Sequence, residues 1–210
     1  MRIITRGRRY DSLKHAMDVI TASIGLILVA PILVVVGVMV AVNLGRPVIF
    51  KQDRPGRHAK VFRLYKFRTM KSIDPSQNLI SDAQRLTRFG RALRASSLDE
   101  LPTLLNVLKG DMSLIGPRPL LVSYLDRYTP EQARRHEVRP GITGLAQANG
   151  RNSLTWIEKF TLDVAYVDNR GVKLDLRILA LTLKAVLARE GISSNGHATM
   201  DEFVGPGENR

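Results

Sequence analysis

The chain has 210 residues, enough for one ordinary hydrophobic core, and we expect one globular domain with appendages rather than two full domains. It carries 32 Lys and Arg against 19 Asp and Glu, a formal net charge of +13, which favours negatively charged partners: nucleic acid, anionic lipid headgroups or phosphorylated small molecules. The chain has no cysteine, which excludes disulfides and thiolate metal sites.

The most apolar stretch runs from residue 19 to residue 42 and reads VITASIGLILVAPILVVVGVMVAV, without one charged side chain. At a rise of ~1.5 Å per residue, a helix of this length can cross the ~30 Å hydrocarbon layer of a bilayer. The stretch is too long for the apolar part of a signal peptide, and no small-residue cleavage site precedes a mature start. The sequence therefore predicts a membrane segment.

Basic residues flank this stretch on both sides, and both flanks thus have the signature of a cytoplasmic face. Pro31, in the middle, removes a backbone hydrogen bond and forces a helix to bend or break. We expect residues 1–45 to form a re-entrant helix, break, helix with the break at Ala30 and Pro31 and both ends at the cytoplasmic headgroups. A single spanning helix kinked at Pro31 is the alternative. The basic residues before the stretch are Arg2, Arg6, Arg8, Arg9 and Lys14, and those after it are Arg46, Lys51, Arg54, Arg57, Lys60 and Arg63.

Residues 46–190 are predicted to form one compact cytoplasmic domain of the α+β class, mostly helical with a small β-hairpin. The hairpin is expected between residues 45 and 70, where β-branched and aromatic residues surround the turn signal Arg54-Pro55-Gly56. Helices are predicted at 82–93, at 124–139 with a break at Thr129-Pro130, and at 173–190. The last is apolar enough to pack on the core or lie at the membrane interface, and residues 191–210 form a polar tail.

Two adjacent carboxylates, Asp99 and Glu100, stand out in this basic chain, within SSLDELPTLLNVLKGDMSLIGPRP at residues 96–119. In one interpretation they only favour a helix N-terminus, because Ser97 and Glu100 have the spacing of a capping box. Pro102 makes that box imperfect, since a helix that starts at Ser97 needs the amide that proline lacks. Successive helical residues point ~100° apart, so the two acids can also serve different partners.

In the other interpretation this helix start binds phosphate. Backbone amides and basic side chains would converge on anionic oxygens, with Arg118 held on a stiff turn between two prolines. A carboxylate placed there can bind a Mg²⁺ that bridges a diphosphate, or attack phosphorus as a nucleophile. The residues alone leave capping and phosphoryl chemistry both open. The basic side chains expected at this site are Lys66, Arg68, Arg94 and Arg118.

Three segments together carry a resemblance to a known family: residues 96–119, YKFRTM at 65–70 and RPGITGLAQANGRNSLTW at 139–156. They resemble the small monotopic phosphoglycosyl transferases of the bacterial sugar transferase family, over nearly the whole chain. The resemblance implies transfer of a phosphosugar from a UDP-sugar to undecaprenyl phosphate with release of UMP, at the cytoplasmic face of the bacterial inner membrane. It also implies Mg²⁺ as cofactor and membrane lipids as partners, and leaves room for downstream glycosyltransferases.

The same resemblance implies roles for single residues. Asp99 matches the nucleophile that forms a covalent phosphosugar intermediate and touches Mg²⁺, and Glu100 matches the partner that deprotonates or positions the lipid phosphate. Lys66, Arg94 and Arg118 match basic positions that hold phosphates.

Two further points rest on the resemblance. Many relatives carry Ser-Pro at the helix break where this chain has Ala30-Pro31, which leaves the break angle less defined. Gln147, Asn149 and Arg151 lie in the loop expected at the sugar nucleotide, and NGRN in this loop is similar to members that use N-acetylated amino sugars such as N,N′-diacetylbacillosamine.

The alternative from another functional class is a membrane-anchored nucleic-acid-binding or scaffold protein. The charge and the arginine-rich segment at 85–94 favour it. Aromatic residues make up only 6% of the chain, however, and no recognised nucleic-acid motif accompanies the basic residues. We therefore expect no nucleic-acid partner.

Overall fold

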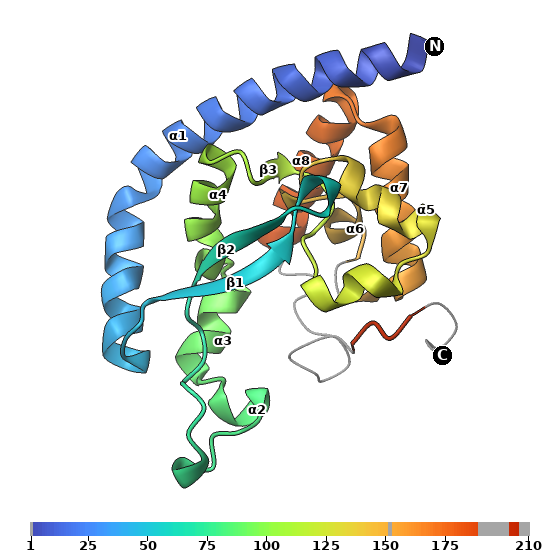
Figure 1. The fold of residues 1–210 in the computed structure, drawn as a ribbon. Helices are drawn as coiled ribbons and strands as arrows, with labels where there is room; N and C mark the ends of the chain where they lie inside the picture. Colours follow the sequence, from blue (N-terminus) through green and yellow to red (C-terminus); the bar gives the residue numbers. More distant parts are fainter. Residues whose placement is uncertain (1, 151–152, 189–201, 206–210) are drawn as a thin grey trace.

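The structure is a computed structural model and describes residues 2–150, 153–188 and 202–205 (Figure 1). It is mostly helical with two small sheets, as the α+β prediction requires. The α-helices of the described residues are α1 (Arg2–Leu44), α2 (Asp82–Arg85), α3 (Arg88–Ala95), α4 (Leu104–Leu108), α5 (Pro130–Ala133), α6 (Leu145–Ala148), α7 (Trp156–Asn169) and α8 (Val172–Ala188). Short 3₁₀ helices are η1 (Arg57–Ala59), η2 (Pro75–Gln77), η3 (Leu98–Thr103), η4 (Val122–Arg127) and η5 (Arg134–Glu137).

The apolar stretch lies within α1, a continuous helix of 43 residues that contains Pro31. Figure 1 shows that α1 bends in its middle. The expected pair of helices around a break is therefore one bent helix, because a proline can kink a helix without ending it. Within the described residues, α1 is the helix long and apolar enough to cross a membrane, and most of its apolar surface is exposed.

Both halves of α1 pack on the rest of the chain. In the first half Ala22 is fully buried in a cluster with Val107 of α4. In the second half Val36 and Val40 are buried in another cluster with Phe67. From residue 20 onward, the large apolar side chains that α1 leaves more than half exposed are Ile20, Ile24, Ile27, Leu28, Val34, Val35, Val38 and Val42.

The predicted hairpin is confirmed. Strands β1 (Ile49–Pro55) and β2 (Val61–Phe67) are antiparallel, with Ile49 opposite Phe67. A second sheet pairs β3 (Ser113–Ile115) in parallel with β4 (Gly141–Thr143). The sequence did not predict this sheet, because a strand of three residues is too short to show a period of two.

The helix predicted at 82–93 is two helices. Thr87 caps α3, its hydroxyl accepting a hydrogen bond from Gly90 N at 3.0 Å. Leu86 before it is extended and pairs with Met70. A second cap inside the apolar pattern therefore ends α2 and starts a new helix.

The predicted helical region at 124–139 is confirmed as three short pieces, η4, α5 and η5, with Thr129 capping α5 in a capping box. The helix predicted at 173–190 is α8. It buries Ile178 completely and exposes Leu176 and Leu183 on its outer side. Within the predicted tail, Phe203 is buried against the aromatic rings of Tyr124, Tyr128, Trp156 and Phe160.

Candidate active site

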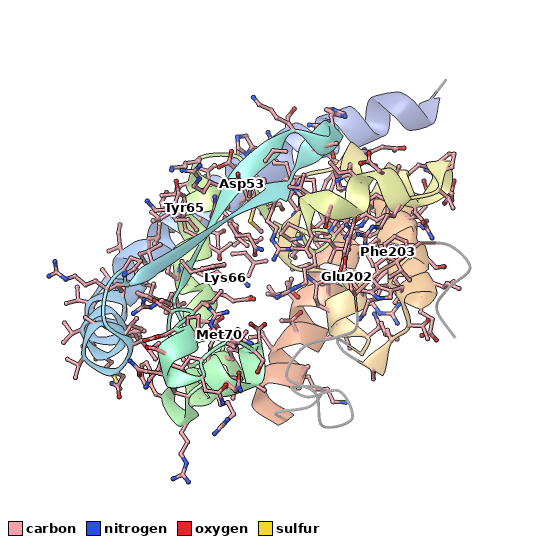
Figure 2. The ribbon with its side chains drawn as sticks, turned by 60° about the horizontal axis from the view of Figure 1, so that its bottom comes forward. Asp53, Tyr65, Lys66, Met70, Glu202 and Phe203 are labelled. Carbon is pink, nitrogen blue, oxygen red and sulfur yellow. The ribbon has the colours of Figure 1, made fainter. Side chains whose placement is uncertain are left out.

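The candidate site lies where β2, η3 and the loop after β3 meet. Lys66 Nζ donates to Glu100 Oε1 at 2.6 Å, and Arg118 Nη2 donates to the same oxygen at 3.0 Å. Figure 2 shows Lys66 pointing from the hairpin toward the helical half of the molecule, where Glu202 and Phe203 lie. The structure thus brings together side chains that are 52 positions apart in the sequence.

Two polar side chains fix η3 and α4 against β2. Asn106 is fully buried, accepts a hydrogen bond from Tyr65 N at 3.1 Å and donates to Arg63 O at 2.8 Å. Thr103 Oγ1 donates to Tyr65 O at 2.9 Å. Because these bonds satisfy backbone groups of Arg63 and Tyr65, just before Lys66, they hold η3 and α4 against β2 and place Glu100 beside Lys66.

The capping box expected between Ser97 and Glu100 is absent, although both acids lie in the first turn of η3. Ser97 has a left-handed backbone with φ of +57° and makes no side-chain capping bond. Glu100 turns to Lys66 and Arg118 rather than to the backbone of Ser97. Pro102 lies inside η3, whose 3₁₀ form replaces the regular α-helical turn that a capping box needs.

The neighbouring carboxyl groups have opposite electrostatic environments. Burial, and then the charge of Glu100, raise the pKa of Asp99 to about 6, against the opposing charges of Lys66 and Arg94. Burial also acts to raise the pKa of Glu100, but the positive charges of Arg118 and Lys66 outweigh it and lower that pKa to about 2. Glu100 is therefore firmly ionised, while Asp99 is held as a less stable and more basic carboxylate.

Asp99 has a feature that distinguishes it from a structural acid. The residue is only 9% exposed, and neither carboxylate oxygen has a hydrogen bond or an ion pair within the described parts of the chain. A buried carboxylate without a partner is costly, so such groups are found where they react or bind a ligand.

Arg94 and Arg118 lie where the sequence places them, near the acids. Arg94 Nε donates to Thr69 Oγ1 at 3.0 Å, and its charge acts on Asp99. The side chain of Arg118 is 47% exposed although it is paired with Glu100, so its guanidinium is open to an incoming anion.

Arg68 lies elsewhere. Its guanidinium donates to the carbonyl oxygens of Leu44, Gly45 and Arg46, where α1 ends. A basic side chain here satisfies carbonyl groups that the last helical turn leaves free. The structure thus places the donors of Arg68 at the end of α1 and not beside the two acids.

The three residues expected at the sugar nucleotide have different surroundings. The side-chain oxygen and nitrogen of Gln147 are buried and find no hydrogen-bond partner among the described residues. The side chain of Asn149 is exposed and donates to Leu145 O. Arg151 lies outside the described residues. Their role stays a prediction.

Magnesium chemistry fits the donor set only in part. Among the described residues there is no group of three or more His, Cys, Asp or Glu that could hold a metal ion. Mg²⁺ is commonly held by one or two carboxylates together with substrate phosphates. The free carboxylate of Asp99, with basic residues around it that can hold phosphates, fits Mg²⁺ binding by one carboxylate together with substrate phosphates.

Sequence reasoning missed a buried ion pair behind the Arg118 loop. Arg135 of η5 and Asp163 of α7 are each 3% exposed, and Arg135 Nη2 lies 2.7 Å from Asp163 Oδ2. The signal was present: Asp163 interrupts the apolar face that Phe160, Val164 and Val167 form on α7. An acid on a core-facing stripe requires a buried partner.

Comparison with known proteins identifies relatives of this chain. Residues 9–189 match the family model described as bacterial sugar transferase. The chain is 54% identical over 198 residues to the uncharacterized sugar transferase EpsL of Bacillus subtilis, covering 93% of this chain and 98% of that protein. It is 38% identical over 192 residues to the UDP-glucose:undecaprenyl-phosphate glucose-1-phosphate transferase of Caulobacter vibrioides, covering 86% and 72%. It is also 37% identical over 199 residues to the undecaprenyl-phosphate galactose phosphotransferase of Salmonella typhimurium, covering 85% of this chain but 41% of that protein.

Proposed function

Because the chain belongs to the bacterial sugar transferase family, we propose that it transfers a phosphosugar from a UDP-sugar to undecaprenyl phosphate, giving undecaprenyl-diphosphate-sugar and UMP. The names of the Caulobacter and Salmonella relatives support the lipid acceptor. The observation that carries the proposal is the buried, unpartnered carboxylate of Asp99 beside a cluster of basic side chains. Such a cluster can hold two phosphorylated substrates next to one nucleophile.

In the first step an oxygen of Asp99 attacks the phosphorus that bears the sugar. A bond forms between this oxygen and phosphorus, the bond from phosphorus to the bridging oxygen breaks, and UMP leaves with that oxygen. The raised pKa supports this role, because a more basic carboxylate is the better nucleophile and is still ionised at neutral pH. Lys66, Arg94 and Arg118 would hold the phosphates in line.

In the second step a phosphate oxygen of the lipid attacks the same phosphorus, and the acyl phosphate bond breaks to return the carboxylate of Asp99. Glu100 would act here mainly by positioning. A carboxylate with a pKa of about 2 takes up almost no proton at neutral pH, so it is a poor base. It instead fixes Lys66 and Arg118, which then meet the lipid phosphate.

Mg²⁺ is part of the proposal, with Asp99 as its protein ligand. When bound, the ion would neutralise charge on the diphosphate of the sugar nucleotide. The basic side chains around Asp99 would neutralise the remaining negative charge of the diphosphate. Glu100, whose pKa is lowered, would stay paired with Lys66 and Arg118 and not bind the ion.

For the sugar we propose an N-acetylated amino sugar such as N,N′-diacetylbacillosamine, supported by the NGRN segment at residues 149–152. A panel of UDP-sugars assayed for UMP release tests this. UDP-glucose and UDP-galactose are the natural controls, because relatives are named for glucose and galactose. Faster turnover with either control than with every amino sugar would overturn the substrate proposal and leave the transferase proposal intact.

For the location we propose the cytoplasmic face of the bacterial inner membrane, with α1 re-entrant. Both halves of α1 pack on the same domain, through Ala22 on one side of the bend and Val36 and Val40 on the other. A straight spanning helix would carry one half to the far side of the bilayer and lose one of these contacts.

The experiment for the proposed function is capture of radiolabelled sugar phosphate on the protein. Asp99→Asn keeps the size of the side chain but loses its charge, so we expect no labelled protein and no UMP release while the fold survives. Near-normal turnover of Asp99→Asn would reject the mechanism. Salt-sensitive DNA retention without UMP release from the wild type would instead favour the nucleic-acid alternative.

A further inference from the structure

The loop that carries Arg118 has few backbone N–H groups that can donate hydrogen bonds. Pro117 and Pro119 have no N–H, so this segment is fixed mostly through its carbonyl groups. Arg135 Nη2 donates to Arg118 O at 2.6 Å. Arg54 Nη1 donates to Pro119 O at 3.4 Å. The carbonyls of Arg118 and Pro119 are therefore bound by arginines from η5 and β1, while Pro117 O accepts a hydrogen bond from Gly141 N at 2.9 Å.

The arginine behind the loop is part of a buried ion pair. Arg135 Nε and Nη2 lie 3.0 and 2.7 Å from the same oxygen, Oδ2 of Asp163, and Nη1 donates to Tyr128 OH at 3.2 Å. The other oxygen, Oδ1 of Asp163, is buried without a hydrogen-bond partner among the described residues. A pair arranged for stability alone would use both oxygens in two parallel bonds. Here one arm of the guanidinium is shared with the carbonyl of Arg118, and an acceptor stays unsatisfied at a cost.

These contacts join α7 to the site in one chain. Asp163 holds Arg135, Arg135 holds the backbone of Arg118, and the guanidinium of Arg118 meets Glu100. We propose that Arg135 and Asp163 are positioning residues, which set the place of the Arg118 guanidinium for the substrate phosphate. The proposal rests on the function proposed above, and it adds two residues that do not touch the substrate.

The same two elements carry a matched control. Arg134, the neighbour of Arg135 on η5, pairs with Asp168 of α7 at the surface. This pair also joins η5 to α7, yet no hydrogen bond of Arg134 reaches the Arg118 loop within the described residues. If the buried pair only held η5 on α7, the Arg134–Asp168 pair would have the same role. If the buried pair positions Arg118, that role is limited to Arg135 and Asp163.

The test is a double-mutant cycle read as the rate of sugar-phosphate capture in a single turnover. We expect Asp163→Asn to slow capture about ten- to a hundred-fold in the wild-type background, because small misplacement of a phosphate-binding group has effects of this size. In the Arg118→Ala background, where no guanidinium is left to position, the same change should slow capture less than about two-fold. Asp168→Asn should change the rate less than about two-fold in both backgrounds.

Equal slowing by Asp163→Asn with and without Arg118 would overturn the proposal, because a purely structural defect does not depend on that side chain. If Asp163→Asn fails to fold, Tyr128→Phe removes only the hydroxyl that receives Arg135 Nη1 and is measured in the same cycle, with the same dependence on Arg118 expected. A wild type that releases no UMP from any UDP-sugar would reject the proposed function itself, before the variants are compared.

Discussion

At the scale of single residues, Asp99 and Glu100 show that neighbours in sequence can have opposite energetic roles. Glu100 gains two cationic partners, and its negative charge stabilises the fold. Asp99 is buried without a partner, and its negative charge costs free energy. This contrast predicts that removing the two charges changes stability in opposite directions.

Asp99→Asn should therefore stabilise the protein at neutral pH while it abolishes activity. A pKa of about 6 against the ordinary 3.8 corresponds to about 3 kcal/mol, an upper bound for the gain. The folded state holds this proton more tightly than the unfolded state, so the wild type loses stability as pH rises from about 4 to 6, and the gain from the variant should disappear below about pH 4. Thermal unfolding in detergent with EDTA, at pH 7.5 and at pH 4, measures this. An unchanged or lowered melting temperature at pH 7.5 would contradict it.

Glu100→Gln is the matched variant with the opposite sign. It leaves Lys66 and Arg118 without their anionic partner, and we expect destabilisation of about 1 kcal/mol or more at pH 7.5 in the same assay. In single turnovers it should slow both steps, because Lys66 and Arg118 lose their anchor, and slow transfer to the lipid more than formation of the phosphosugar enzyme, so that labelled enzyme accumulates. Equal slowing of both steps would place Glu100 in the first displacement.

Several contacts of the candidate site could be predicted from the sequence, and each contact that was missed has a physical reason. The grouping of Glu100 with Lys66 and Arg118 was expected from their chemistry, and the structure confirms it. Arg68 was expected with them, because a sequence shows a basic residue but not the free carbonyls at the end of α1 that bind it. The pair of Arg135 and Asp163 depends on a contact across 28 positions, which no local pattern shows.

At the scale of elements, the close contact between α3 and the backbone after β2 determines which residue can stand at position 90 more than helix propensity does. Gly90 of α3 lies against the backbone of Thr69, two residues after the end of β2. A Cβ at position 90 would come within 1.9 Å of Thr69 O. The same Thr69 accepts a hydrogen bond from Arg94. The glycine therefore allows α3 to bring Arg94 to the site. The sequence predicted a helix here but not its division into α2 and α3, since the cap at Thr87 lies within an unbroken apolar pattern.

Gly90→Ala should lower stability by about 3 kcal/mol or more, because neither backbone can move without disturbing the other. Helix propensity alone predicts the opposite, a gain of about 1 kcal/mol. Ala92→Gly, at an exposed position of the same helix, is the control and should cost about 1 kcal/mol. Thermal unfolding compares the three proteins, and a stabilised Gly90→Ala would show that α3 can move away from Thr69.

At the scale of the whole molecule, the question is which side of the membrane each end of α1 occupies. The chain has no cysteine, so single cysteines report cleanly. With Arg8→Cys or Lys60→Cys, we expect labelling by an impermeant maleimide only after the inner membrane is opened. Labelling of either position in intact spheroplasts would restore the single span. Pro31→Ala should increase any spanning population, because it restores the hydrogen bond that proline removes.

The way α1 is joined to the chain also limits how such an enzyme can be re-engineered. Ala22, Val36 and Val40 belong to the same clusters as side chains of β2, α3 and α4, and the buried guanidinium of Arg68 donates to the carbonyl oxygen of Leu44, the last residue of α1. Arg68 follows Lys66 by two residues on one strand and its extension. Truncation before Gly45 would thus uncover two apolar surfaces and remove one of the acceptors that hold the buried guanidinium of Arg68. Helix α1 therefore cannot be exchanged for another membrane anchor without loss of core contacts. A water-soluble redesign would have to replace the face of α1 that packs on the domain as well as remove the apolar face that is exposed.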